Sequence, residues 1–181
     1  MTHPKILLRQ ASATIFAALL PCLGGHAQER CQAFNLETLP KREVRAVWLT
    51  TLSNLDWPKG YATTQEGIER QKRQLTEILD RYAEANINTV LFQVRVRATT
   101  TYPSALEPWD RCLTGQEGRA PGYDPLRFAI EECHKRGMEI HAWLATIPCG
   151  PWTSLGCRRL RAKGLRLRKL DGAGYLDPSD E

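Results

Sequence analysis

Four polar or aromatic residues occupy matching positions near the ends of two predicted strands, where such side chains can bind a ligand. They are Gln93, Arg95, His141 and Trp143. Arginine and glutamine form directed hydrogen bonds with hydroxyl and carboxylate groups, and a histidine ring offers a donor and an acceptor. The flat tryptophan ring offers an apolar face with a polar N–H at its edge. Together these residues favour a binding site, although each alone has a structural explanation, such as an ion pair for Arg95 or a core position for His141.

The strands that carry these residues alternate with helices along the chain. The predicted strands are Val44–Thr51, Asn88–Arg95 and Met138–Leu144, and an amphipathic helix separates each strand from the next. This order indicates parallel strands with right-handed crossovers, which is the α/β class. In a parallel barrel, outward positions meet the helices, and inward positions at the carboxyl ends of the strands build the active site. We therefore expect the four residues to converge on one pocket mouth.

The ends of the two helices are marked by capping residues. Thr63 and Glu66 have the spacing of a capping box at the start of the first helix. Asn86 is a suitable left-handed stop for the same helix. Asp124-Pro125 combines an N-cap side chain with the residue best suited to the first helical position. Gly137 can adopt the left-handed conformation that ends the second helix near Arg136.

The start of the chain has the three parts of an export signal. Lys5 and Arg9 precede an apolar run from Ala11 to Leu23, and Gly25-His26-Ala27 has small residues at the cleavage positions. The apolar run is too short to span a membrane as a mature helix. A lipoprotein signal at Pro21-Cys22 is a weaker interpretation, because proline fits poorly before a lipidated cysteine.

These features divide the chain into three segments. Residues 1–27 are the predicted signal peptide, residues 28–41 an irregular lead-in, and residues 42–181 the β/α domain. The mature protein is expected in the periplasm, at the cell surface or in the extracellular medium. No transmembrane segment is expected after removal of the signal.

Charge and cysteine content argue against several other classes of protein. The net charge of +5 is mild, and much of it comes from one basic run at residues 158–169. A solvated loop or helix face explains this run better than a nucleic-acid interface, because no stacking aromatic residues are interleaved with the cations. The cysteines have no metal-ligand spacing, although Cys149 and Cys157 could pair across a loop in an oxidising compartment. No metal ion, cofactor or nucleic-acid partner is expected.

Several short motifs occur in a fixed order along the chain. They are Val44–Thr51, Phe92–Arg95, Tyr102–Ser104, Glu107–Trp109, Leu113–Gly115, Tyr123–Leu126 and His134–Trp143. In this order they resemble the glycosyl-hydrolase-like family ten proteins, which are distinct from the xylanases that share the family number. The resemblance covers roughly residues 42 to 178. The ordered series is specific, although each motif alone is weak.

The resemblance implies an exported bacterial TIM (β/α)8 barrel that hydrolyses glycosidic bonds in a polysaccharide or cell-wall glycan. Only the first three β/α units are readable, so residues 42–181 are expected to be the N-terminal part of an incomplete barrel. Many relatives have an Asp where this chain has Ala98-Thr99-Thr100, and Asn-Pro where it has Ala145–Pro148. The acidic strand expected after Tyr175–Pro178 is absent. The chain therefore resembles a fragment of a secreted glycoside hydrolase.

The catalytic residues stay unknown at this stage. Glycoside hydrolysis generally uses two carboxyl groups on either side of the scissile bond. The rim acids Asp56, Glu107 and Asp110 show no convincing pairing. Tyr102 and Trp109 join the four residues above as candidates for binding the glycan substrate, since their rings can stack on sugars.

Two alternative functions stay open. A non-catalytic glycan-binding module would need only the same aromatic residues. An anion-binding or nucleic-acid-binding protein would use the basic run at residues 158–169, and its binding would depend steeply on salt.

Overall fold

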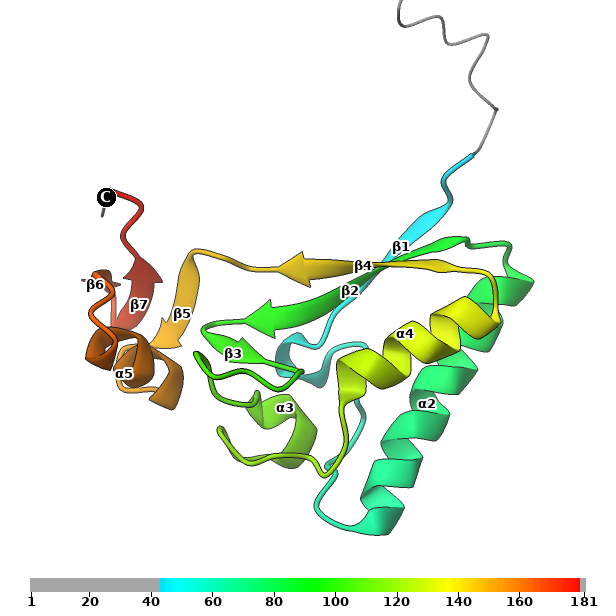
Figure 1. Cartoon of the computed structure of the whole chain (residues 1–181), viewed down its shortest axis with the longest axis horizontal. Coiled ribbons are helices and arrows are strands. Elements are labelled where there is room, and N and C mark those ends of the chain that lie inside the picture. Colours follow the sequence, from blue (N-terminus) through cyan, green and yellow to red (C-terminus); the bar gives the residue numbers. More distant parts are fainter. Residues whose placement is uncertain (1–42, 180–181) are drawn as a thin grey trace, which may run out of the picture. The chain divides into compact units, whose positions relative to one another are not determined.

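Parallel strands form the centre of the structure, a computed structural model that describes residues 43–179 (Figure 1). Strand β2 (Thr89–Val96) lies between β1 (Ala46–Leu49) and β4 (Glu139–Leu144) and pairs with both in parallel. The short strand β3 (Thr99–Thr100) turns back and pairs with the end of β2 in antiparallel orientation. The predicted order and the α/β class are confirmed. Residues 43–179 do not form a closed barrel.

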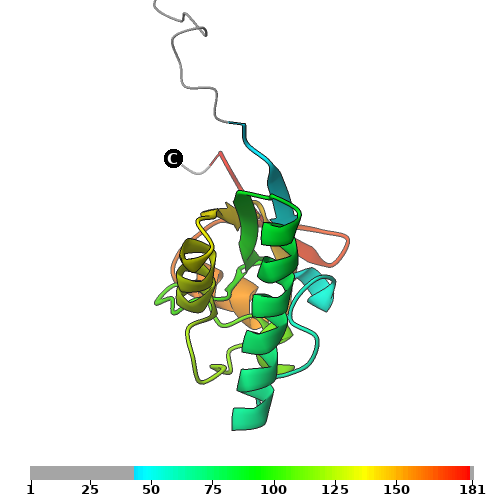
Figure 2. The ribbon, with the colours of Figure 1, turned by 90° about the vertical axis from the view of Figure 1, so that its right-hand side faces the viewer.

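Two helices cover one face of this sheet. Helices α2 (Gln65–Glu84) and α4 (Pro125–Lys135) lie next to each other on that face (Figure 2). The sheet contributes alternate apolar residues to the core between the layers, among them the fully buried Phe92. The helices contribute residues spaced by three or four positions, such as Leu75 and Leu79, as expected for amphipathic helices. Burial of these side chains is the main favourable contribution to folding.

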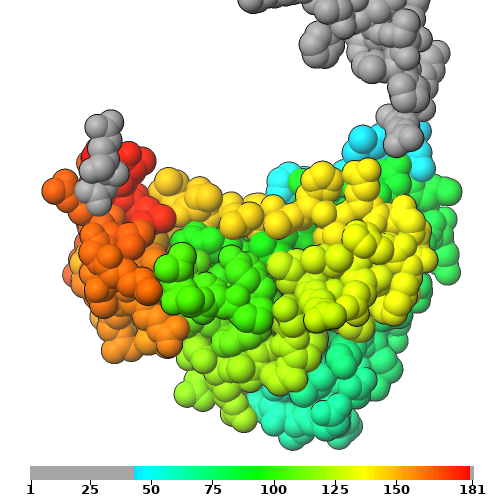
Figure 3. Space-filling model, viewed as in Figure 1, coloured from blue at the N-terminus to red at the C-terminus, as the bar shows by residue number. Residues whose placement is uncertain are grey.

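The other face of the sheet is open in the described part of the chain. Trp48 is 57% exposed on this face. Its register partner Leu91 and the next partner across the sheet, His141, lie on the same side, because parallel register partners share a face. No described helix covers these residues, and the surface is hollowed above β4 (Figure 3).

The helix ends agree with the predicted caps except at one position. The first helix is capped by Thr64, whose Oγ1 accepts a hydrogen bond from Gly67 N at 3.1 Å. The prediction of Thr63 was therefore wrong by one residue, because adjacent threonines offer the same capping chemistry. Asn86 has a positive φ, 57°, as predicted for a left-handed stop. Asp124 Oδ1 accepts from Arg127 N at 3.1 Å, and Gly137 has a φ of 67°, so both ends of α4 are confirmed.

A second, antiparallel sheet follows the parallel one. Its strands are β5 (Pro148–Pro151), β6 (Leu167–Leu170) and β7 (Ala173–Leu176), with helix α5 (Leu155–Ala162) between β5 and β6. We call residues 148–176 the C-terminal lobe. The basic run at residues 158–169 lies mainly on α5 and β6 and is therefore not simply a loop.

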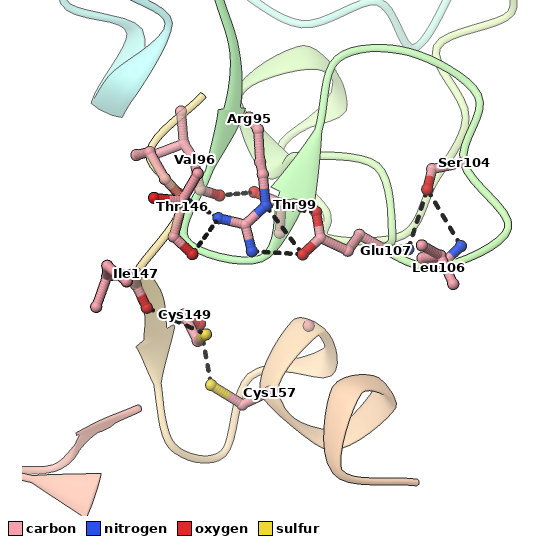
Figure 4. A network of polar contacts seen from close by, with 12 residues as sticks. Arg95, Val96, Thr99, Ser104, Leu106, Glu107, Thr146, Ile147, Cys149 and Cys157 are labelled. Carbon is pink, nitrogen blue, oxygen red and sulfur yellow. Dashed lines mark hydrogen bonds and ion pairs between the residues drawn. The ribbon is translucent and has the colours of Figure 1, made fainter. Parts of the chain in front are cut away.

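Two cysteines occupy the core of the C-terminal lobe. Cys149 and Cys157 are both fully buried and both carry free thiols. The Cys157 thiol donates to the backbone oxygen of Cys149 at 3.0 Å (Figure 4). Burial, followed by the proximity of Cys157, raises the pKa of the Cys149 thiol. The possible disulfide between them is not formed in the structure.

Two further sequence-based expectations concern the signal peptide and membrane-spanning helices. The predicted signal peptide and most of the lead-in lie outside the described residues. Within the described residues, no helix has both the length and the apolar character required to cross a membrane.

The cap of α4 leads to a stability prediction. Replacing Asp124 by Ala removes the acceptor for Arg127 N and should lower the free energy of unfolding by about 1 kcal/mol. Chemical denaturation of the full chain measures this difference. Asp124→Asn is the matched control, because it keeps an oxygen at the capping position. Equal stability of the Ala variant and the unsubstituted chain would show that the cap does not contribute.

Glu132 on α4 leads to a prediction about pH. Its pKa is lowered by the hydrogen bond from Lys135 and, against the opposing effect of burial, by Arg136. These partners lie 2.5 and 2.8 Å from the carboxylate. A group whose folded pKa is depressed stabilises the fold above its unfolded pKa, and that contribution is lost as the pH falls through the folded pKa. Glu132→Gln should therefore destabilise the chain more near pH 7 than near pH 3.

The exposed neighbour Glu131, whose side chain is 52% exposed, supplies the control for this pH comparison. Glu131→Gln should show a much smaller dependence of the stability loss on pH. An equal loss at both pH values for Glu132→Gln would mean that its ion pairs do not stabilise the fold.

Candidate functional site

Gln93 holds the loop that follows β1. Its Oε1 accepts hydrogen bonds from Thr50 Oγ1 at 2.5 Å and from the backbone nitrogens of Thr51 and Leu52, each at 3.1 Å. Its side chain is buried, with the residue 3% exposed. These bonds fix the short helix η1 (Leu52–Asn54) beside the carboxyl end of β2. Gln93 therefore positions a loop at the predicted site, and its side-chain oxygen already accepts hydrogen bonds from that loop.

Arg95 forms a buried ion pair with Glu107 (Figure 4). The guanidinium Nε lies 2.8 Å from Glu107 Oε2, and Nη2 lies 2.5 Å from Oε1. The remaining Nη1 donates to the backbone oxygens of Ala145 and Thr146. Ser104 Oγ, in turn, accepts from Glu107 N at 3.2 Å. The structure therefore supports the structural ion pair that the sequence left open for Arg95.

His141 and Trp143 lie on the open face of the sheet. Trp143 packs edge to face against Trp48, with ring centroids 4.7 Å apart and an interplanar angle of 85°. His141 Nε2 lies 3.3 Å from Glu139 Oε2, and its side chain is 59% exposed. The aromatic pair and the histidine form an exposed surface that can contact a ligand. Trp48 was absent from the predicted site, although it alternates with Val47 and Leu49 along β1 and therefore lies on this face.

Tyr102 and Trp109 do not belong to this surface on the open face. Both are half-buried and pack against the core between the sheet and its helices. Trp109 also forms a backbone bridge with Thr100 at the end of the sheet. The six predicted residues therefore fall into three groups: buried polar residues on β2, the exposed His141 and half-buried Trp143 on β4, and aromatic residues at the core. Their binding of a glycan stays a prediction.

The three predicted rim acids all have partners within the chain. Asp56 Oδ2 accepts from Thr50 N at 2.8 Å, and Glu107 is bound by Arg95. Asp110 caps the short helix α3 (Arg111–Thr114) through Cys112 N at 2.7 Å and also accepts from the Thr99 hydroxyl. These carboxylates stabilise loops and do not form an acid–base pair. Residues 43–179 also contain no cluster of three His, Cys, Asp or Glu side chains that could hold a metal ion.

A cavity of about 690 Å³ opens among the loops at the carboxyl ends of the strands. Its walls come from the segment after β1, the turn after β2, the connection around α3 and the segment that leads from β5 into α5. Cys112 lines it, and burial together with the nearby charge of Asp110 raises the pKa of this thiol well above its ordinary value. The thiol is therefore neutral near pH 7 and is not an activated nucleophile. No local sequence pattern indicates this cavity, because its walls come from segments that are far apart in the chain.

The parallel β/α units, with aromatic residues and a cavity at the carboxyl ends of the strands, define an α/β protein whose site lies where such sheets build active sites. Residues 43–151 match the family described as "Glycosyl hydrolase-like 10". The chain belongs to this glycosyl hydrolase-like family.

Two curated relatives show the same similarity. The chain is 44% identical over 102 residues to "Glycosyl hydrolase YngK" of Bacillus subtilis (strain 168), a match that covers 56% of this chain and 19% of the relative. It is 41% identical over 104 residues to "Glycosyl hydrolase DigH" of Escherichia coli (strain K12), covering 55% of this chain and 24% of the relative. The matched part of the chain thus corresponds to about a fifth to a quarter of these relatives.

The buried ion pair leads to a stability prediction. Glu107→Leu leaves the Arg95 guanidinium buried without its carboxylate and should lower the free energy of unfolding by about 3–5 kcal/mol. The double variant Arg95→Met, Glu107→Leu should recover much of this loss, because apolar residues of similar volume can replace a buried pair. Urea denaturation of both variants measures the difference. A single variant as stable as the unsubstituted chain would rule out the pair as a structural requirement.

Proposed function

We propose that this chain is part of an exported glycoside hydrolase, and that its parallel sheet contributes glycan-binding residues to the active-site end of a TIM barrel. The proposed substrate is a polysaccharide or cell-wall glycan. Support for the class of activity comes from the glycosyl hydrolase-like family and from the names of the two relatives. The proposed export rests on the signal-like sequence of residues 1–27.

The observation that carries the glycan-binding role is the aromatic pair formed by the exposed Trp48 and the half-buried Trp143 on the open face. An aromatic ring presents an apolar face to the C–H bonds of a pyranose and leaves the sugar hydroxyls at its edge in water. His141 lies on the same face of the same strand as Trp143 and offers a donor or acceptor to those hydroxyls. Gln93 and Arg95 act indirectly, because their buried polar groups hold the loops around this surface.

Hydrolysis needs two carboxyl groups placed across the glycosidic bond. The rim acids Asp56, Glu107 and Asp110 are all engaged in loop contacts. We therefore assign substrate binding to the residues described above, and we place the catalytic carboxylates in parts of a complete barrel other than residues 43–179.

The engaged acids also favour a second candidate function, a non-catalytic glycan-binding module. Such a module would use the same tryptophan pair. The basic run is a weaker candidate for function, because two of its cations already have partners. Arg161 stacks over Trp152 at 4.2 Å, and Arg168 Nε lies 2.8 Å from Asp177 Oδ2.

The tryptophan pair gives the test of this function. Trp48→Ala and Trp143→Ala should each weaken the binding of soluble oligosaccharides roughly tenfold, because each removes one stacking face. Calorimetric titration of the full chain with a panel of neutral and acidic oligosaccharides measures this effect. Trp152→Ala is the control, since it removes an indole from the C-terminal lobe. Unchanged affinity in both open-face variants would contradict the proposed binding surface.

Assays of glycan binding and hydrolysis on a complete protein of the length of the relatives distinguish the two functions. Release of reducing sugar ends from a glycan that binds supports the hydrolase. Binding to the same surface without any release supports the non-catalytic module.

A further inference from the structure

The cavity among the loops contains two backbone turns in unusual conformations. Ser53 and Asn54, in the loop after β1, have φ values of 54° and 58°. Arg97 and Ala98, in the turn between β2 and β3, have φ values of 53° and 59°. Residues other than glycine rarely adopt positive φ, and such residues are frequent at binding sites. Three of these four residues line the cavity.

The fold holds Arg97 in place at the cavity wall. The two-residue turn between antiparallel strands usually contains Asn-Gly or Gly because both positions need positive φ, yet here an arginine occupies the first position. Arg97 Nη2 donates to Ser53 Oγ at 3.3 Å and so joins the two unusual turns. A Cβ atom added to Gly150 on β5 would lie 3.0 Å from the Cβ of Arg97. Because Gly150 has no side chain, Arg97 can pack closely against the backbone of β5.

The carboxylates that line the cavity already accept hydrogen bonds from the chain. Both oxygens of Asp110 are bonded, to Cys112 N and to the Thr99 hydroxyl. Both oxygens of Glu117 accept from backbone nitrogens at the start of α5, at 3.2 and 2.8 Å. Among residues 43–179, by contrast, neither Arg97 nor Arg111 forms an ion pair with a carboxylate. Both guanidinium groups therefore keep N–H donors that can bind an anionic ligand.

An exposed aromatic ring lines the same cavity as these cations. Tyr61 lines the cavity and is 50% exposed. Its ring packs closely against Gly115, where an added Cβ would lie 3.2 Å from a ring carbon. The contact with Gly115 holds the ring at the wall and leaves half of the residue accessible.

We propose that this cavity binds a carboxylate-bearing sugar unit, with Arg97 and Arg111 binding the carboxylate and Tyr61 stacking on the pyranose ring. Guanidinium groups bind carboxylates through paired, charge-assisted hydrogen bonds, and a tyrosine ring suits the apolar face of a sugar. The inference rests on the proposed function in taking the ligand to be a glycan. It adds a second contact region, separate from Trp48 and Trp143, and a preference for acidic sugars.

The test uses the full chain and two sugars that differ only at C6, D-glucuronate and D-glucose. Amide chemical shifts in ¹H–¹⁵N spectra are followed during titration with each sugar and, separately, with acetate. Glucuronate should shift the signals of Tyr61, Arg97 and Arg111 and bind at least about tenfold more tightly than glucose or acetate. Arg97→Ala and Arg111→Ala should each remove most of this preference.

Arg158→Ala is the matched control, because it removes the same charge from an exposed position on α5 outside the cavity. It should leave the preference for glucuronate unchanged. Equal binding of acetate and glucuronate would show a simple anion site. Equal binding of glucose and glucuronate would show that the arginines do not recognise the carboxylate. Either result overturns the proposal. Shifts confined to Trp48 and Trp143 would overturn it while leaving the proposed function intact. Shifts at the cavity without any at the tryptophans would support it and contradict the open-face site.

Discussion

The ion pair between Arg95 and Glu107 is the contact on which the carboxyl end of the parallel sheet depends. A guanidinium group removed from water needs both an opposite charge and further hydrogen-bond acceptors. Glu107 supplies the charge from the connection after β3, and the backbone oxygens of Ala145 and Thr146 supply acceptors from the segment after β4. One side chain on the central strand thereby fixes two loops that are far apart in the sequence. Gln93, two residues earlier, does the same for the loop after β1.

Local sequence patterns predicted the elements well because their causes are local. Strand alternation identified the apolar face of β2, and the N-cap and glycine signals located both ends of α4. The error of one residue at Thr63 has an equally local cause, since Thr64 offers the same hydroxyl group next to it. The irregular connection after β2 was harder to predict. Its short strand β3 and helix α3 depend on contacts of Thr100 and Asp110 with segments that no local pattern identifies.

The candidate site was predicted only in part, because a site depends on which strands pair and in what register. Arg95 was placed correctly near the end of its strand, but its partner comes from a loop twelve residues further along the chain. Trp143 was identified and Trp48 was not, since their contact follows from pairing through β2. The cavity also depends on contacts between segments that are distant in the sequence. Its arginines lie in segments that are separated in sequence, and only the turn after β2 brings Arg97 toward the loop after β1.

The register of the three parallel strands orders the open face into levels. From the amino to the carboxyl end, the levels are Ala46, Thr89 and Glu139, then Trp48, Leu91 and His141, and finally Thr50, Gln93 and Trp143. Exposed apolar area is unfavourable in water by about 25 cal/mol per Å², so a face that carries Trp48 and Leu91 gains stability when it is covered. In the proposed barrel, further strands would enclose the first level, and the middle and last levels, which carry Trp48, His141 and Trp143, would lie toward the rim where a substrate binds. The edge-to-face contact between the two tryptophans spans the middle and last levels. The aromatic pair would then form part of the binding surface, and the buried polar groups of Gln93 and Arg95 would hold the surrounding loops at that rim.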